Sequence, residues 1–107
     1  MQKGNLFTQR GKALVSKVHD HGDIAKSVTK AIDLIGGLGK IVKGGETVLL
    51  KPNYVFPKPP PATTANDFIT AVISLLRKQG ASRVIVGESC FYAMSTRKVM
   101  ERLGAIE

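Results

Sequence analysis

Cysteine is nearly absent from this sequence of 107 residues, in which Cys90 stands alone. One cysteine cannot form an internal disulfide, and it falls short of the about four ligands that a structural zinc ion or an iron–sulfur cluster needs. We therefore expect no metal or cofactor site within this chain. Most lone cysteines are packing residues, and nothing around Cys90 has the second glycine of a hydrolase nucleophile elbow.

Long apolar runs are also lacking. A membrane-spanning helix needs about 18 or more consecutive apolar residues, and a secretory signal needs an apolar stretch that the polar N-terminus MQKGNLFTQRGK does not have. The hydrophobic content of 43% is nevertheless that of a chain with a modest core. These patterns predict a soluble globular protein of the cytoplasm with no membrane association.

Dense runs of positive charge and interleaved aromatic residues are missing as well. The net charge is +8, but the sixteen lysines and arginines are scattered from Lys3 to Arg102, and aromatic residues make up 6% of the chain. Proteins that bind nucleic acid concentrate basic residues on one face or combine them with stacking platforms. We therefore expect the partner to be an anionic small molecule or a protein rather than a nucleic acid.

What the chain does have is an alternation of short apolar runs and helical periodicity. The pattern predicts three strands, at Ala13–Val18, Thr47–Lys51 and Arg83–Gly87. It also predicts three helices, from about Asp23 to Ile35, from an N-cap at Thr64 to Gly80, and from an N-cap at Ser95 to Gly104. Strands and helices in the order βαβαβα predict an α/β fold, with a small parallel sheet and helices on its faces.

The ends of the chain predict the domain organisation. Residues 1–12 form a polar N-terminal tail, and residues 13–107 form a partial α/β domain. Ala105-Ile106-Glu107 looks like the start of a further strand, and three parallel strands would leave an open sheet edge. We therefore expect the chain to be the N-terminal part of a larger doubly wound domain, or its edge to be covered in a homo-oligomer.

The connection from Asn53 to Thr63 is about twice as long as strand-to-helix loops usually are. Its prolines lie at positions 57, 59, 60 and 61 and keep the backbone extended and stiff. This combination favours a binding loop or lid. The alternatives are a spacer, or a proline-rich ligand for another protein.

Polar side chains gather where ligands usually bind in open parallel sheets, beyond the carboxyl ends of the strands. The candidate ligand-binding residues are Lys51, Asn53, Thr63, Thr64, Glu88 and Ser89. Lysine and the hydroxyls at a helix N-terminus suit a phosphate or carboxylate. The alternative is structural: Thr64 caps the helix, Lys51 extends into solvent, and Asn53 bonds its own turn.

Two other motifs are weaker evidence for a binding site. Gly36-Gly37-Leu38-Gly39-Lys40 follows a helix and has Ile41 where a phosphate loop has Ser or Thr, so we do not interpret it as one. His19-Asp20-His21 lies on a short strand-to-helix turn, where such residues usually solvate or cap instead of binding a metal.

The order of several segments carries a family resemblance over residues 13–106. These segments are Gly36-Gly37-Leu38, Val48-Leu49-Leu50-Lys51-Pro52-Asn53, Thr63-Thr64, Lys78-Gln79-Gly80-Ala81 and Val84-Ile85-Val86-Gly87-Glu88-Ser89. Together they resemble the N-terminal part of the family catalogued as domain of unknown function 362. That family commonly has Gly-Asp-Ser after the third strand, where this chain has Glu88, one methylene longer. The resemblance implies that a longer protein continues into a cysteine-rich, ferredoxin-like segment with a four-iron cluster.

Two hypotheses follow. The resemblance implies the N-terminal α/β part of an iron–sulfur-associated redox or electron-transfer protein, which binds an anionic ligand or docks a redox partner protein. The arrangement of Lys51, Asn53, Thr64 and Glu88 alone indicates a cluster-free α/β enzyme or binding module for a phosphorylated or carboxylated small molecule.

Overall fold

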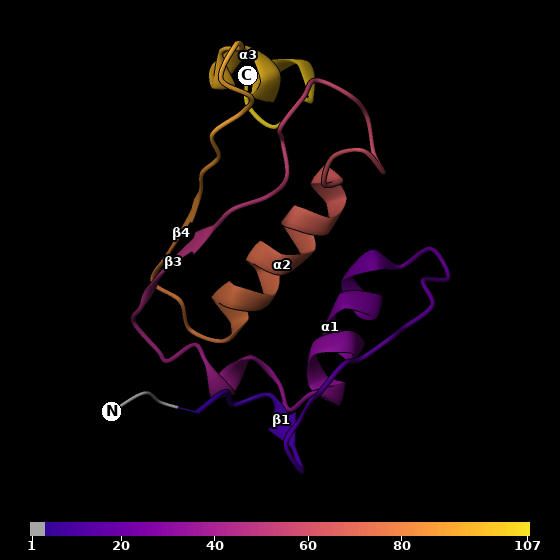
Figure 1. Cartoon of the computed structure of the whole chain (residues 1–107). Helices are drawn as coiled ribbons and strands as arrows, with labels where there is room; N and C mark the ends of the chain where they lie inside the picture. The colour runs from indigo at the N-terminus through magenta and orange to yellow at the C-terminus, as the bar shows by residue number, and fades with distance from the viewer. Residues whose placement is uncertain (1–3) are drawn as a thin grey trace.

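The computed structural model describes residues 4–107, so the first three residues of the expected N-terminal tail lie outside it (Figure 1). The elements are β1 (Thr8–Gln9), β2 (Lys12–Ala13), α1 (Ile24–Leu34), the 3-10 turn η1 (Leu38–Lys40), β3 (Thr47–Leu50), α2 (Asn66–Lys78), β4 (Arg83–Val86) and α3 (Thr96–Arg102). Strands β1 and β2 form an antiparallel hairpin. The predicted α/β class is confirmed.

Strands β3 and β4 pair in parallel and are connected by helix α2. Their register places Thr47 beside Arg83 and Leu50 beside Val86. The side chains alternate along both strands between exposed and half-buried positions, as expected when one face of a sheet is covered. The half-buried residues are Val48, Leu50, Val84 and Val86. The predicted small parallel sheet is thus present as a βαβ unit.

Helix α2 lies between the sheet and helix α1, as Figure 1 shows. Its apolar face carries the buried residues Ala71 and Leu76, and α1 contributes buried Val28. Asp23, where the sequence predicted the first helix to begin, is the N-cap of α1 and accepts a hydrogen bond from the Lys26 N–H at 3.1 Å. Within residues 4–107, no helix is both long enough and apolar enough to cross a membrane.

Gly80 ends α2 with a backbone conformation that favours glycine, φ +103°. A Cβ atom at this position would lie 3.3 Å from the Gly44 Cα. The Gly45 N–H donates to the Gly80 carbonyl at 2.8 Å, so the turn before β3 packs directly against the end of α2. The close approach of these two turns fixes where β3 starts.

The predicted first strand, Ala13–Val18, is wrong beyond its first residue. Strand β2 ends at Ala13, and residues 14–18 have no neighbouring strand. The structure does show the alternation that predicted a strand: Leu14, Ser16 and Val18 are partly buried, and the residues between them are exposed. The Ser16 hydroxyl donates to the Ala31 carbonyl of α1 at 2.6 Å, so the segment is attached to a helix instead of a sheet.

The predicted N-cap of α2 is also wrong. The cap is Ala65, with no side-chain hydrogen bond, because the Thr64 hydroxyl already accepts from the Asn53 N–H at 2.9 Å. The cap predicted for α3 is confirmed, since Ser95 accepts from the Lys98 N–H. The Thr64 hydroxyl thus makes a hydrogen bond within the long loop instead of capping α2.

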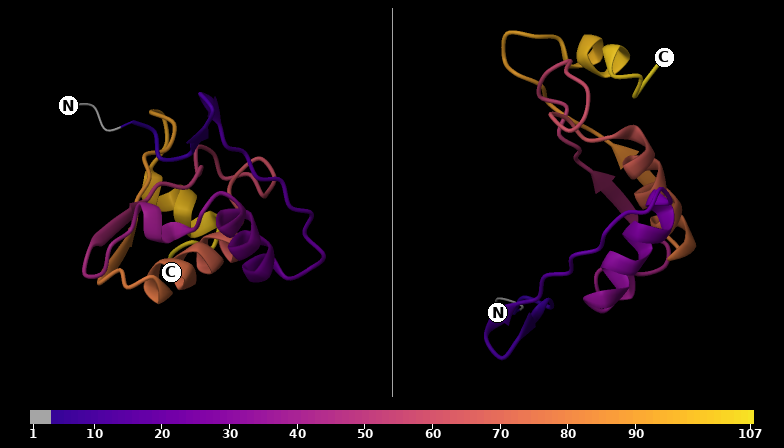
Figure 2. Two further views of the ribbon diagram at one scale, coloured as in Figure 1. Left: turned by 90° about the horizontal axis from the view of Figure 1, so that it is seen from below. Right: turned by 90° about the vertical axis from the view of Figure 1, so that its right-hand side faces the viewer.

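The chain is more open than a compact domain of its length. Its radius of gyration is 15.6 Å, whereas about 13 Å is typical of 100 residues. Figure 2 shows the β1–β2 hairpin and α3 at opposite ends of the molecule. The sheet face that points away from α2 carries Leu49 and Ile85, which are neighbours in the register and are 66% and 38% exposed. This face of the sheet therefore exposes two neighbouring apolar side chains to solvent.

The packing predicts how two leucines differ in their contribution to stability. Leu76→Ala should lower the free energy of unfolding by about 2 to 5 kcal/mol, because it leaves a cavity where α2 packs. Leu34→Ala is the matched control on α1, where the side chain is 60% exposed, and should change it by about 0.5 kcal/mol or less. Urea denaturation followed by circular dichroism measures both. Equal effects would contradict the described core.

Candidate functional site

Beyond their last residues, β3 and β4 continue side by side as two joined loops. The Gly87 N–H donates to the Leu50 carbonyl at 2.9 Å, which extends the ladder by one bond. Farther out, the Phe91 N–H donates to the Val55 carbonyl at 3.2 Å. The polar residues after each strand are therefore held at one edge of the sheet, where parallel sheets commonly bind ligands.

Lys51 and Glu88 form an ion pair across this edge. The Lys51 Nζ lies 2.6 Å from the Glu88 Oε1, and the two side chains differ sharply in exposure, at 71% for Lys51 and 3% for Glu88. The Glu88 side chain is buried, while most of the Lys51 side chain is exposed to solvent. An ammonium has three N–H donors, and this ion pair uses one of them.

The protein stabilises the ionised form of Glu88. Its Oε2 accepts from the Tyr54 N–H at 3.0 Å, and its Oε1 accepts from the Ser89 N–H at 2.8 Å. Burial opposes ionisation, but these hydrogen bonds and the Lys51 ammonium outweigh it and hold the pKa of Glu88 below its usual value. Glu88 is therefore the charged anchor that sets the position of Lys51.

Asn53 and Thr64 pair with each other at the two ends of the proline-rich loop. The Asn53 N–H donates to the Thr64 Oγ1 at 2.9 Å, and the Thr64 N–H donates to the Asn53 carbonyl at 3.0 Å. Inside the loop, the buried Thr63 hydroxyl donates to the Lys58 carbonyl at 2.6 Å. The loop is a closed Ω-type structure whose ends meet, and its two threonines make hydrogen bonds within it.

Of the six predicted site residues, the structure thus groups Lys51 with Glu88 and the Ser89 backbone, and separately Asn53 with Thr64. Thr63 is turned into the loop. Ser89 is exposed, and its backbone N–H donates a hydrogen bond to the Glu88 carboxylate. The six residues therefore form two separate groups at the edge of the sheet, with Thr63 apart from both.

Tyr54 was not among the predicted site residues, yet it organises this edge. It is 2% exposed, its N–H holds Glu88, and its hydroxyl donates to the Asn66 Oδ1 at 2.7 Å. Burial raises the pKa of Tyr54. Asn66 in turn donates to the Leu103 carbonyl at 2.7 Å, which attaches the end of α3 to the start of α2. A sequence signal did exist: a tyrosine directly after Lys51-Pro52-Asn53.

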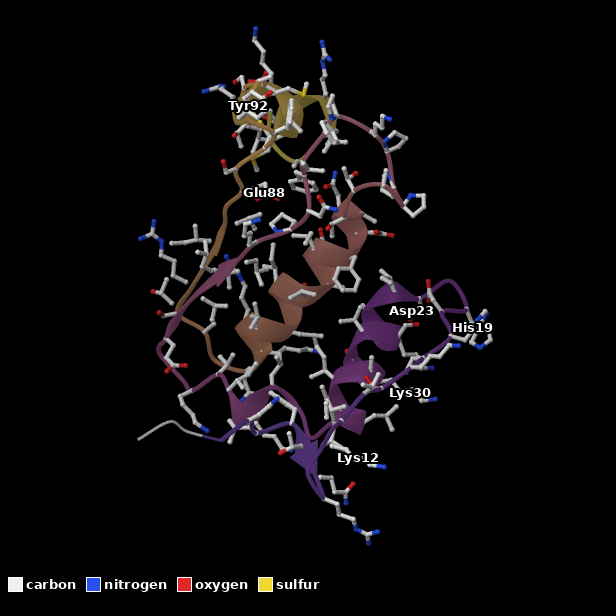
Figure 3. The ribbon with its side chains drawn as sticks, in the orientation of Figure 1. Lys12, His19, Asp23, Lys30, Glu88 and Tyr92 are labelled. Atoms are coloured by element: carbon white, nitrogen blue, oxygen red, sulfur yellow. The ribbon has the colours of Figure 1, made fainter. Side chains whose placement is uncertain are left out.

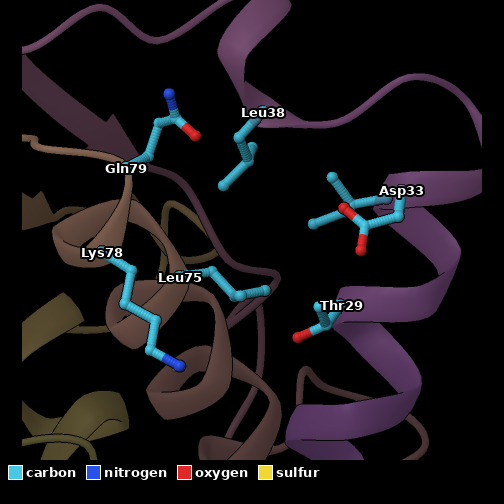
Figure 4. Close-up of a pocket in the computed structure, with 7 residues that line it drawn as sticks. Thr29, Asp33, Leu38, Leu75, Lys78 and Gln79 are labelled. Carbon is cyan, nitrogen blue, oxygen red and sulfur yellow. The ribbon is translucent and has the colours of Figure 1, made fainter.

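The cavity between α1 and α2 is a different feature. Figure 4 shows its lining, which includes Thr29, Asp33, Leu75 and Lys78. Its volume is about 150 Å³, below the about 300 Å³ at which small-molecule pockets begin. None of the predicted site residues lines it, so we do not assign it to ligand binding.

The described residues do not fit a metal ion or an iron–sulfur cluster. Residues 4–107 contain no group of three or more His, Cys, Asp or Glu side chains arranged to hold a metal. The rings of His19 and His21 lie 4.6 Å apart, and Asp20 between them accepts from the Ser27 hydroxyl. The Cys90 Sγ lies 3.2 Å from the Met94 carbonyl, within its own loop.

Comparison with known proteins adds a family and a relative. Residues 48–107 match the family model described as domain of unknown function (DUF362). A thylakoid-associated protein of Synechocystis sp. is 31% identical over 93 residues, which are 85% of this chain. The chain spans 28% of the length of that relative. No solved structure matches the chain significantly.

The lowered pKa of Glu88 predicts an acid-sensitive contribution to stability. Glu88→Gln should lower the unfolding free energy by about 1 to 3 kcal/mol at pH 7, because the buried site loses its charge. The folded-state pKa lies below the unfolded value of about 4.3, so this contribution is complete above that pH and is lost as the pH falls through the folded pKa. Denaturation at a series of pH values measures it.

Glu101→Gln is the control, because Glu101 forms an exposed pair with Arg97 on α3. It should change stability by about 0.5 kcal/mol or less. A difference between the wild type and Glu88→Gln that persists unchanged below the folded pKa would show that charge is not the cause.

Proposed function

The chain belongs to the family described as domain of unknown function 362, and we propose that the carboxyl edge of its parallel sheet binds a small carboxylated or phosphorylated ligand. Lys51 is the main contact of this ligand. Glu88 is a positioning residue, which holds the ammonium in place and does not itself touch the anion.

The difference in exposure between Lys51 and Glu88 carries this proposal. An ion pair usually presents both charges to solvent, but here the carboxylate is 3% exposed and the ammonium side chain 71%. An anion that approaches the edge therefore meets donors first, with the repelling carboxylate behind them. The buried anchor also limits the side-chain entropy that Lys51 loses on binding, which is one of the costs of association.

The charge of the whole chain also favours a negatively charged ligand. At long range the charges of Lys51 and Glu88 cancel, so attraction of an anion depends on the remaining charges. The net charge of +8 supplies a positive field around the whole molecule, which raises the local concentration of anions and their association rate at low ionic strength.

The proposal predicts that Lys51→Ala weakens binding of inorganic pyrophosphate or citrate about tenfold, the effect of one charged hydrogen bond. Lys51→Arg should keep most of the affinity. Titrations followed by NMR chemical shifts of the backbone amides near position 51 measure both, and circular dichroism checks that each variant is folded.

Lys30→Ala is the matched control. It removes the same charge from an exposed lysine on α1, away from the sheet edge (Figure 3). Its effect should be limited to weaker long-range attraction. If Lys51→Ala and Lys30→Ala weaken binding equally, Lys51 makes no specific contact and the proposed site is wrong.

Family membership supports a second proposal, which concerns the whole protein. The chain spans 28% of its Synechocystis relative, so the greater part of a protein of that kind lies outside it. We propose that this chain is the N-terminal α/β part of a redox or electron-transfer protein whose cysteine-rich continuation holds a four-iron cluster.

Iron and acid-labile sulfide analysis tests the second proposal. The anaerobically purified full-length protein should contain about four irons per chain. The 107-residue chain is the internal control and should contain none, because its single cysteine cannot hold a cluster. A full-length protein without iron would rule out the redox function and leave the anion site unaffected.

A further inference from the structure

Three aromatic rings cluster on the two loops that leave β3 and β4. The Phe56 and Phe91 ring centroids lie 5.4 Å apart, and the Phe91 and Tyr92 centroids lie 4.3 Å apart. All three side chains are exposed, at 40%, 37% and 91% respectively. We call these three residues the aromatic platform. Exposed apolar groups gathered in one patch commonly mark a binding surface.

The platform belongs to the same edge as the Lys51–Glu88 pair. Phe91 follows Glu88 by three residues, which reach at most about 10 Å. The hydrogen bond from the Phe91 N–H to the Val55 carbonyl fixes the platform to the β3 loop, and the bond from the Tyr54 N–H to Glu88 fixes that loop to the ion pair. Figure 3 shows Glu88 beyond the sheet and Tyr92 farther out on the same side.

We propose that the ligand of this edge is a planar aromatic ring that carries a phosphate, as in a mononucleotide. The ring stacks on the aromatic platform, and the phosphate accepts hydrogen bonds from the Lys51 ammonium. This inference rests on the anion site proposed above and specifies its ligand. A sugar would join the ring to the phosphate.

Two observations favour this ligand over a plain anion or an apolar partner. A plain anion would leave the platform uncovered, and stacking on exposed aromatic side chains adds affinity for any ring with a π-face. An apolar partner would leave the charge of the largely exposed Lys51 side chain unused. A ligand with a ring at one end and an anion at the other satisfies both groups at once.

Paired probes test the proposal with the 107-residue chain. FMN and riboflavin share one fluorescent ring and differ by the phosphate, and AMP and adenosine, used as competitors, form a second such pair. Quenching of flavin fluorescence should show FMN binding about tenfold more tightly than riboflavin, with AMP displacing FMN better than adenosine does. Lys51→Ala should remove the preference for FMN.

Variants of the platform test the ring contact. Tyr92→Leu and Phe91→Leu keep apolar volume and remove stacking, so each should weaken FMN and riboflavin about fivefold or more. Tyr92 is 91% exposed, so its substitution leaves the fold intact. Phe68→Leu is the matched control, because Phe68 is a 40% exposed phenylalanine on α2, outside the platform, and it should have no effect on binding.

The outcomes separate this inference from the function on which it rests. Pyrophosphate binding that depends on Lys51, together with FMN affinity that is unchanged in both platform variants, overturns the stacking proposal and leaves the anion site standing. FMN that binds no more tightly than pyrophosphate overturns it as well. Absence of binding by pyrophosphate and FMN alike rejects both proposals.

Discussion

The carboxyl edge of the parallel sheet depends on the hydrogen bonds and the ion pair that the buried Glu88 carboxylate makes. This carboxylate binds the Lys51 ammonium, the Tyr54 N–H and the Ser89 N–H, so one buried side chain holds both strand exits together. Two-stranded parallel pairing is weak by itself, and these bonds extend it past the last ladder residues.

Local signals in the sequence were enough to predict the elements whose stability is local. Ser95 begins α3 as its capping pattern predicts, α1 begins close to the expected Asp23, and the apolar runs of β3 and β4 lie where expected. The family and the α/β class followed from the same segments. These features depend on neighbours within a few residues, and a sequence contains that information directly.

What sequence could not predict depends on contacts between distant residues. Residues 14–18 have the alternation of a strand but not a partner strand, which no local pattern reveals. In the sequence Thr64 fits the pattern of a helix N-cap, yet its hydroxyl accepts a hydrogen bond from the Asn53 N–H across the long loop. Lys51 and Glu88 were both predicted at the edge, but their ion pair, its unequal exposure and the nearby aromatic platform all require the register of β3 and β4.

The parallel pairing of β3 and β4 has a consequence for synthesis on the ribosome. The first contacts between the strands join residues 36 positions apart, such as Ser82 and Glu46. At about 5 to 20 residues per second, β3 waits roughly 2 to 7 seconds for its partner to be made. During that interval the apolar sequence Thr47–Leu50 is open to other chains. The strand is preceded by the charged Glu46 and followed by the charged Lys51 and by Pro52. Charged residues and prolines that flank an apolar strand discourage strand-to-strand aggregation. Lys51, which pairs with Glu88 in the folded chain, is thus also one of the charges that flank the strand while its partner is being made.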